Sequence, residues 1–174
     1  MVKRVLKPGT TPWLATDAIL FLEDFFKERP NAKVLEFGSG GSSVWFAKRT
    51  GNLVSIDHYK PWAEQVRVLL GDLVVDFRLV PRPYAFVCDE FEDETIDLVL
   101  VDGRDRVECV KKARRIIKPN GVLMLDNSER HRYNPVRIML KEWPHVEVNQ
   151  IGPNLHGMRS RKGWRTSWWF KPKE

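Results

Sequence analysis

The chain has 174 residues, of which 43% are hydrophobic and 30% are charged, and its formal net charge is +6. This composition is ordinary for one folded domain, and the positive charge permits an acidic partner without requiring one. No apolar stretch is long enough to span a membrane, and the N-terminal residues lack the apolar core of a secretory signal. The two cysteines form no CxxC or Cys/His cluster, so the sequence indicates neither a disulfide framework nor a zinc site and favours a cytoplasmic setting.

The first expected element is a helix over residues 14–29, where apolar residues recur at helical spacing until Pro30 ends the run. This helix forms most of an N-terminal extension, residues 1–31. We expect its apolar face to pack on a sheet. Trp13 stands at its start, where the side chain could face a ligand or only the core.

Residues 33–57 form the most informative stretch of the sequence. A short apolar run over 34–37 predicts a buried parallel strand, and three glycines follow within four residues, at Gly38, Gly40 and Gly41. A serine then caps a short helix, and a second apolar strand ends in Asp57. Strand, glycine turn, helix, strand and terminal acid are the pattern of a nucleotide-binding βαβ unit. Glycine allows the sharp turn and leaves no Cβ against a ligand, and the terminal acid is placed to accept hydrogen bonds from ribose hydroxyls.

The spacing of the glycines in this turn indicates which nucleoside-containing ligand the site binds. The dinucleotide fingerprint G-x-G-x-x-G requires glycine at position 43, where the chain has Ser43, so a site for NAD is the less favoured alternative. The chain instead has E-x-G-x-G at Glu36, Gly38 and Gly40. This pattern resembles motif I of the class I S-adenosylmethionine-dependent methyltransferases, with Ser42 in place of the third glycine.

The resemblance implies S-adenosylmethionine as the cofactor. It implies that Asp57 binds the adenosine ribose and that Glu36 lies near the amino end of the methionine moiety. His58 follows at the position where the family closes over the nucleoside, although an exposed loop histidine is an equal alternative. The residues that we expect to bind the cofactor are Glu36, Gly38, Ser39, Gly40, Ser42, Asp57, His58 and Asp102.

The middle of the chain continues the alternation of helices and strands. A helix is expected from Pro61 to about Leu70 and a third strand over 74–80. Residues 81–97 contain two prolines and a run of acids, which leave room for little helix. In the family this region contacts the adenine edge. The candidates for that contact are Tyr84, Cys88 and Asp89.

Two further strands end in polar residues. The fourth, over 96–101, ends in Asp102, and after a helix with a basic, solvated face the fifth, over 122–125, ends in Asp126 and Asn127. Ligands of open parallel sheets bind beyond the carboxyl ends of the strands, so these groups should share one crevice. Their oxygen atoms suit Mg²⁺. The alternative is that Asp102 only orients cofactor or substrate and that the other two make loop hydrogen bonds.

The arrangement is similar to that of catechol O-methyltransferase-type enzymes, in which such residues hold the metal. These enzymes carry a lysine base just after the first metal-binding acid, where this chain has Arg104. An arginine is effectively never neutral, so it is a poor base. His131 is the expected general base and Glu129 a second candidate, against the alternative of loop residues without a catalytic role.

The C-terminal part predicts a helix over 136–143, a sixth strand over 146–151 and a seventh, antiparallel strand over 166–170. The glycine-rich, basic connection between the last two strands should form a mobile hairpin loop. Its basic side chains could bind a phosphate, a carboxylate or RNA, or could simply be solvated. These side chains are Arg159, Arg161, Lys162 and Arg165.

Together the elements predict an α/β fold. We expect one domain over residues 1–174, with a Rossmann-like, doubly wound, mostly parallel seven-stranded sheet over 33–170 and an antiparallel last strand. The resemblance implies an S-adenosylmethionine-dependent methyltransferase acting on a small-molecule acceptor at oxygen, with Asp102 and His131 as catalytic residues and with or without Mg²⁺. Two alternatives stay open: a nucleic-acid methyltransferase, favoured by the positive charge but lacking a [DN]-P-P-[YFW] motif, and a non-catalytic binding module.

Overall fold

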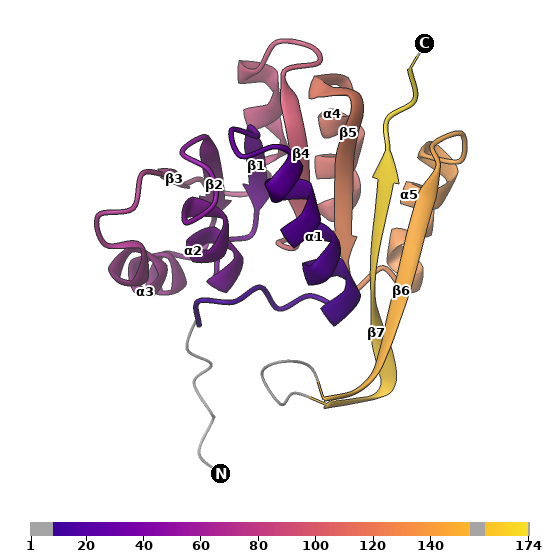
Figure 1. Ribbon diagram of the computed structural model, residues 1–174, viewed down its shortest axis with the longest axis horizontal. Coiled ribbons are helices and arrows are strands. Elements are labelled where there is room, and N and C mark those ends of the chain that lie inside the picture. Colours follow the sequence, from indigo (N-terminus) through magenta and orange to yellow (C-terminus); the bar gives the residue numbers. More distant parts are fainter. Residues whose placement is uncertain (1–8, 154–158, 174) are drawn as a thin grey trace.

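The computed structural model describes residues 9–153 and 159–173, and the side chains among them outside 153–162. Seven strands form one sheet in the order β3-β2-β1-β4-β5-β7-β6 (Figure 1). The strands are β1 (Val34–Phe37), β2 (Leu53–Asp57), β3 (Asp76–Leu79), β4 (Ile96–Val101), β5 (Ile117–Asp126), β6 (His145–Pro153) and β7 (Arg159–Phe170). The first five run parallel, and β7 lies antiparallel between β5 and β6. The predicted doubly wound sheet with an antiparallel last strand is confirmed.

Helices cover both faces of the sheet because the central strands are apolar on both faces. Leu98 and Leu100 of β4 pack with the α1 and α2 side, whereas Val99 and Val101 pack with the η1, α4 and α5 side, as the two-residue period of a strand requires. The helices are α1 (Thr16–Glu28), α2 (Gly41–Ala47), α3 (Lys60–Leu70), α4 (Arg106–Ile116) and α5 (Asn134–Met139), with 3-10 turns η1 (Ala85–Glu90) and η2 (His131–Tyr133).

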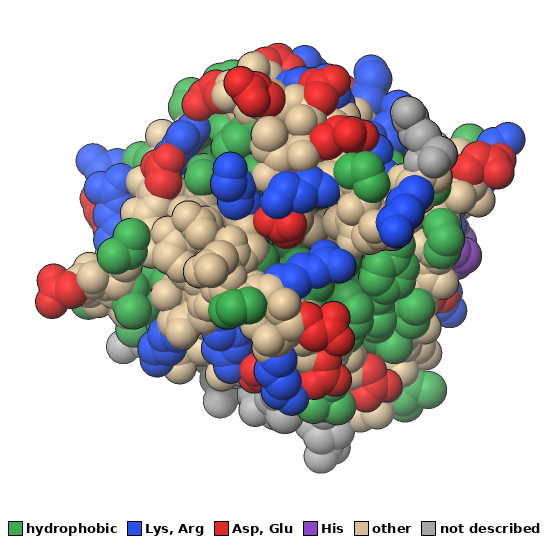
Figure 2. All heavy atoms as spheres, turned by 45° about the horizontal axis from the view of Figure 1, so that its top comes forward, with side chains coloured by type: hydrophobic (Ala, Val, Ile, Leu, Met, Phe, Trp, Pro, Cys, Tyr) green, Lys and Arg blue, Asp and Glu red, His purple; other side chains and the backbone are tan. Residues whose placement is uncertain are grey.

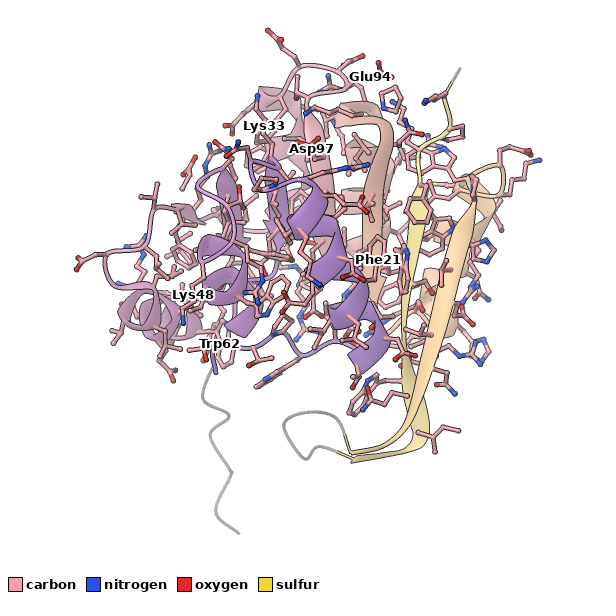
Figure 3. The ribbon with its side chains drawn as sticks, in the orientation of Figure 1. Phe21, Lys33, Lys48, Trp62, Glu94 and Asp97 are labelled. Atoms are coloured by element: carbon pink, nitrogen blue, oxygen red, sulfur yellow. The ribbon has the colours of Figure 1, made fainter. Side chains whose placement is uncertain are left out.

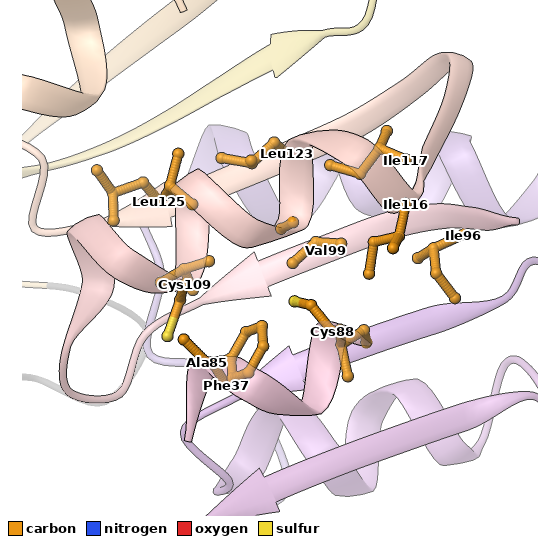
Figure 4. Close-up of a cluster of buried hydrophobic side chains, with 14 of the residues drawn as sticks. Phe37, Ala85, Cys88, Ile96, Val99, Cys109, Ile116, Ile117, Leu123 and Leu125 are labelled. Carbon is orange, nitrogen blue, oxygen red and sulfur yellow. The ribbon is translucent and has the colours of Figure 1, made fainter. Parts of the chain in front are cut away.

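The cluster on the α4 side contains both cysteines (Figure 4). Cys88 and Cys109 are free thiols with no exposed surface. Burial raises the pKa of the Cys88 thiol to about 12 and raises that of Cys109 as well. Both side chains therefore act as small apolar residues of the core.

Three predicted boundaries are wrong: the start of β5, the end of α5 and the extent of the β6–β7 hairpin. Strand β5 begins at Ile117, ahead of the predicted start at residue 122. Asn120 takes a positive φ of 58°, and the register with β4 shifts along this part of the strand. The bulge keeps the two strands paired. Helix α5 ends at Met139, since Leu140 leaves the helical conformation.

The predicted loop after residue 151 is largely strand. Gly152 and Gly163 adopt positive φ angles of 106° and 72°, and the ladder continues to the pair Pro153–Arg159 after a register shift. The side chains of Arg159, Arg161 and Lys162 lie outside the described residues.

The parallel strands end at a common edge, which lies at the bottom of Figure 1. Residues 9–15 run along this edge before α1 begins, so the N-terminal segment passes close to the tips of β1 and β2. Of the helices in the described part of the chain, none has the length and apolar character needed to cross a bilayer.

Candidate active site

A cavity of about 500 Å³ opens at the carboxyl edge of the parallel strands. Two groups of lining residues differ in chemistry. One group, the glycine–serine wall, consists of Gly38, Ser39, Gly40, Gly41, Ser42, Asp57, His58 and Trp62. The other, the arginine wall, consists of Arg104, Arg106, Arg130 and Arg132. Asp102 and Gly103 at the tip of β4 lie between them, and Trp13, Asn127 and Tyr133 complete the lining.

The turn after β1 requires glycine for a steric reason. Gly38 has a φ of 100°, and a Cβ built on it would lie 2.5 Å from the backbone nitrogen of Gly103. A Cβ on Gly103 would in turn overlap the Tyr84 hydroxyl. The tips of β1 and β4 therefore touch through their backbones, which brings the two strand ends to one floor of the cavity.

Glu36 lies beneath this turn and not in the cavity lining. Its side chain is fully buried, and its carboxylate accepts hydrogen bonds from the hydroxyls of Ser42, Ser43 and Ser55. Burial raises the pKa of Glu36 to about 7, although the three hydroxyls favour the charged form and oppose the shift. The acid of motif I thus ties β1, the start of α2 and β2 together.

Asp57 organises the other end of the glycine–serine wall. Its Oδ2 accepts hydrogen bonds from the backbone nitrogen and the hydroxyl of Ser39, at 3.1 and 2.9 Å. Its Oδ1 accepts from the backbone nitrogens of His58 and Tyr59, at 2.7 and 2.8 Å. The carboxylate therefore stands at the tip of β2 in a fixed orientation, facing the cavity that the glycine turn borders.

Two tryptophans close one side of the cavity. Trp62 of α3 donates a hydrogen bond from Nε1 to the carbonyl oxygen of Ser39 at 2.7 Å, and its ring meets that of Trp13 edge to face, with 6.0 Å between centroids. Trp13 is held there because the N-terminal segment crosses the start of α2, where a Cβ on Gly41 would lie 2.3 Å from the carbonyl oxygen of Thr11. The N-terminal segment is thus part of the cavity wall.

Arg106 crosslinks the tips of β4 and β5. Its side chain is only 6% exposed, and its guanidinium donates hydrogen bonds to the carbonyl oxygens of Gly103, Asp102 and Asp126. It also forms an ion pair with the Asp102 carboxylate at 2.9 Å. Burial raises the pKa of both acids, and the nearby Asp102 charge raises that of Asp126 further, while Arg106 opposes these shifts. The buried guanidinium thus binds the Asp102 carboxylate and the backbone of Asp126.

A model of the methyltransferase domain family matches residues 35–128, which is more than half of the chain and includes β1 through β5. The chain belongs to the methyltransferase domain family. The resemblance to class I S-adenosylmethionine-dependent methyltransferases that motif I indicates is therefore confirmed. A search of curated protein sequences finds no match.

Solved structures of methyltransferases share the fold. The chain is similar to an S-adenosylmethionine-dependent O-methyltransferase from Thermotoga maritima, with 12% identity and a TM-score of 0.67 over 94% of this chain and 68% of that chain. It is also similar to a precorrin-6y C5,15-methyltransferase from Geobacter metallireducens (16%, 0.64, 94% of each chain) and to a tRNA (m1A58) methyltransferase from Aquifex aeolicus (12%, 0.66, 98% and 74%). At these identities the likeness shows the fold alone.

The predicted magnesium ligands of this methyltransferase domain do meet at one edge, but they do not fit a divalent ion. The Arg106 guanidinium already binds the Asp102 carboxylate and the carbonyl oxygen of Asp126. Asp126 Oδ1 accepts a hydrogen bond from the Thr166 hydroxyl at 2.8 Å, and the Asp126 side chain is not among the cavity-lining groups. A metal ion here would face a buried positive charge, which opposes its binding. Within the described residues there is also no group of three His, Cys, Asp or Glu side chains arranged to bind a metal.

Other predicted residues lie away from the cavity lining. His131 is exposed on η2. Glu129 accepts a hydrogen bond from the backbone nitrogen of Arg165 at 3.0 Å. Of the adenine candidates, Tyr84 is buried and hydrogen-bonded to the backbone of Arg104, Cys88 is in the core, and Asp89 is paired with Lys112.

Sequence reasoning missed both the Trp62 ring and the arginine wall. Asp102 lies before α4, which begins at Arg106, so no helical spacing indicates their ion pair. The position of Trp62, soon after the terminal acid of β2, could have indicated that it lies near the cavity. Its hydrogen bond to Ser39 depends on how α3 packs and could not be predicted. Arg130 and Arg132 come from a loop and a 3-10 turn, where no period indicates a direction.

Proposed function

We propose that this domain transfers the methyl group of S-adenosylmethionine to an oxygen of a small-molecule acceptor. The observation that carries the proposal is the single cavity of about 500 Å³, into which the glycine turn, Asp57 and Asp102 converge from the tips of β1, β2 and β4. This volume lies in the range of small-molecule sites. Residues 1–174 act as one domain in this proposal, because the N-terminal segment contributes Trp13 to the cavity.

The glycine–serine wall holds the cofactor. Asp57 accepts hydrogen bonds from the ribose hydroxyls, and the backbone of Gly38, Ser39 and Gly40, with Ser42 at the helix start, lies against the rest of the nucleoside and the methionine moiety. Glu36 acts from below by orienting Ser42. His58 and Trp62 provide ring surface for the adenine, as a base stacks readily on aromatic side chains.

When bound, S-adenosylmethionine supplies an electrophilic methyl group on a sulfonium. The chain must then hold an acceptor hydroxyl in line with that methyl group and take its proton. Asp102 is the acid placed for this task, since its side chain is 26% exposed at the cavity and its pKa is raised by burial. Arg106 holds Oδ1, so Oδ2 would receive the hydroxyl proton as the acceptor oxygen takes the methyl group, the methyl–sulfur bond breaks and S-adenosylhomocysteine leaves as the neutral thioether. No step requires a divalent ion.

The choice of oxygen as acceptor is supported by the activity of one structural neighbour, the O-methyltransferase. An RNA acceptor is the second candidate, because another neighbour acts on tRNA and the chain carries a net charge of +6. The volume of the cavity favours the small molecule. RNA binding that weakens steeply with salt would favour the alternative.

The proposal is tested by calorimetric titration of S-adenosylmethionine into the native chain and an Asp57→Ala variant. Asp72→Ala, which removes an exposed acid of the turn after α3, is the matched control. Asp57→Ala loses hydrogen bonds to a charged group, so its affinity for S-adenosylmethionine should fall by roughly 10- to 100-fold. The affinity of Asp72→Ala should stay that of the native chain. Added Mg²⁺ should leave the affinity unchanged. No binding to the native chain would refute the proposed function.

A further inference from the structure

The cavity carries a surplus of positive charge on one side. Four arginines line it against two acids, Asp57 and Asp102. Asp57 is engaged by backbone nitrogens of the glycine–serine wall, and Asp102 is paired with Arg106. Of the other three members of the arginine wall, Arg130 acts on Asp102 through its nearby charge, which opposes the rise that burial causes in the pKa of that carboxyl. Among the described side chains, Arg104 and Arg132 form no ion pair with either acid of the cavity.

These three side chains also have little compensation from elsewhere. Within the described part of the chain, neither Arg104 nor Arg132 forms an ion pair, and the Arg132 guanidinium lies over the Tyr133 ring at 5.0 Å. Arg130 has one loose contact, 3.7 Å from Nε to Glu129 Oε1. All three are exposed, so each has donors available to a ligand.

The opposite edge of the sheet shows how this chain treats charges that only face solvent. Figure 3 places Glu94 and Asp97 at that edge, far from Trp62 at the cavity. There Asp97 is paired with Lys118 at 2.8 Å and Glu94 with Lys171 at 2.9 Å. Figure 2, which brings this edge forward, shows basic and acidic side chains intermixed. These two acids each have a basic partner, whereas the described residues give Arg104 and Arg132 no acidic partner within ion-pair distance.

The positive side of the cavity continues into a neighbouring hollow of about 380 Å³. Arg104, Arg106, Arg132 and Tyr133 line both spaces. An acceptor held against the Tyr133 ring would therefore have guanidinium groups on two sides. Such planar donors match a carboxylate or a phosphate, which they can bind through paired hydrogen bonds.

We propose that Arg104, Arg130 and Arg132 bind a carboxylate or phosphate group carried by the small-molecule methyl acceptor. The inference rests on the proposed function and adds the substrate class to it. The anionic group anchors the acceptor at the arginine wall and leaves its hydroxyl at Asp102. A cavity of about 500 Å³ has the size of a small-molecule site, and an RNA occupant is an outcome that the test below distinguishes.

The test uses the full chain saturated with S-adenosylhomocysteine, whose binding is first verified by calorimetry. Inorganic phosphate and benzoate are titrated separately at constant ionic strength, and the arginine Nε–H signals are followed by NMR. At least one anion should give saturable shifts of the arginine-wall signals. Its affinity should fall about fivefold or more in Arg130→Gln and in Arg132→Gln. Arg67→Gln, which removes the same charge from the exposed face of α3, should bind as the native chain does.

Each result has a defined meaning. Saturable shifts with only one of the two anions would support the proposal and identify the anionic group as a phosphate or as a carboxylate. Shifts that do not saturate, or that are equal in all variants, would overturn the proposal while leaving the cofactor site intact. A single-stranded RNA oligonucleotide that binds far more tightly than either anion and shifts signals beyond the cavity would overturn the small-molecule class. Failure of S-adenosylhomocysteine to bind would instead reject the proposed function itself.

Discussion

The two walls of the cavity are built in different ways. The glycine–serine wall consists largely of backbone and short hydroxyl side chains. Its carboxylate, Asp57, and the Glu36 carboxylate buried beneath it each accept hydrogen bonds from several donors of the protein. The arginine wall consists of long side chains, three of which come from exposed positions and lack firm partners. The first wall is rigid before any ligand arrives, whereas the second has donors left for one. One cavity can therefore combine a wall suited to the proposed cofactor with a wall suited to the proposed acceptor.

The largest expected effect comes from Arg106, the one buried member of the arginine wall. Arg106→Ala should lower the free energy of unfolding by roughly 3 to 5 kcal/mol, since it leaves the partly buried Asp102 carboxylate without its partner and three carbonyl oxygens without a donor. Urea unfolding measures this loss, with Arg67→Ala as the control. A loss below about 1 kcal/mol would contradict the idea that Arg106 joins the tips of β4 and β5.

The glycine turn should respond almost as strongly. Gly38→Ala places a Cβ against the backbone of Gly103 at a positive φ, which should cost about 3 kcal/mol and abolish cofactor binding. Gly51→Ala is the matched control, because a Cβ there meets nothing within 4 Å. Stability and S-adenosylmethionine affinity are measured in both variants. Equal behaviour of the two variants would mean that the close approach of β1 and β4 is not needed.

Glu36 predicts a pH dependence of stability. The unfolded carboxyl releases its proton near pH 4.5 and the folded one only near pH 7, so the folded state binds the extra proton in this window. The stabilisation is complete below pH 4.5 and is lost as the pH rises through 7. It amounts to at most about 3 kcal/mol at 1.36 kcal/mol per pKa unit. The raised pKa of Asp126 acts in the same direction.

Glu36→Gln removes this titration and keeps the shape of the side chain. Urea unfolding at about pH 5 and about pH 8 should show a smaller decline in the variant than in the native chain. Glu64→Gln, at an exposed position of α3, should keep the native slope. An identical pH slope in Glu36→Gln would show that Glu36 is already ionised in the folded protein at acid pH.

Trp62 is expected to give the smallest effect. Trp62→Phe keeps a ring at the cavity but removes the hydrogen bond to the carbonyl oxygen of Ser39. Cofactor affinity should fall by about fivefold, which corresponds to a bond of about 1 kcal/mol. Titration calorimetry measures it, and Trp143→Phe, a substitution outside the cavity lining, should leave the affinity unchanged. A loss above 100-fold would indicate that the indole itself is an essential contact.

The sequence predicts one wall of the cavity far better than the other. The turn at Gly38 and the acid Asp57 are readable because a tight backbone approach and a terminal strand position each admit few residue types. The sheet is readable from its apolar runs, apart from ends such as Ile117, where a bulge at Asn120 extends the strand. Arg130, Arg132 and Trp62 are not readable, since exposed loops and helix packing direct their side chains without any sequence period. His131 lies in the same irregular segment, so its predicted catalytic role had no support from a sequence period, and the residue lies outside the cavity lining.

Amide hydrogen exchange with and without saturating S-adenosylhomocysteine tests the division of the cavity most directly. We expect the cofactor product to slow amide exchange at residues 38–43 and 57–59, which include most of the glycine–serine wall. Exchange at residues 128–133 should change little. Protection confined to residues 128–133, or no protection at either wall despite saturation, would contradict this division of the cavity.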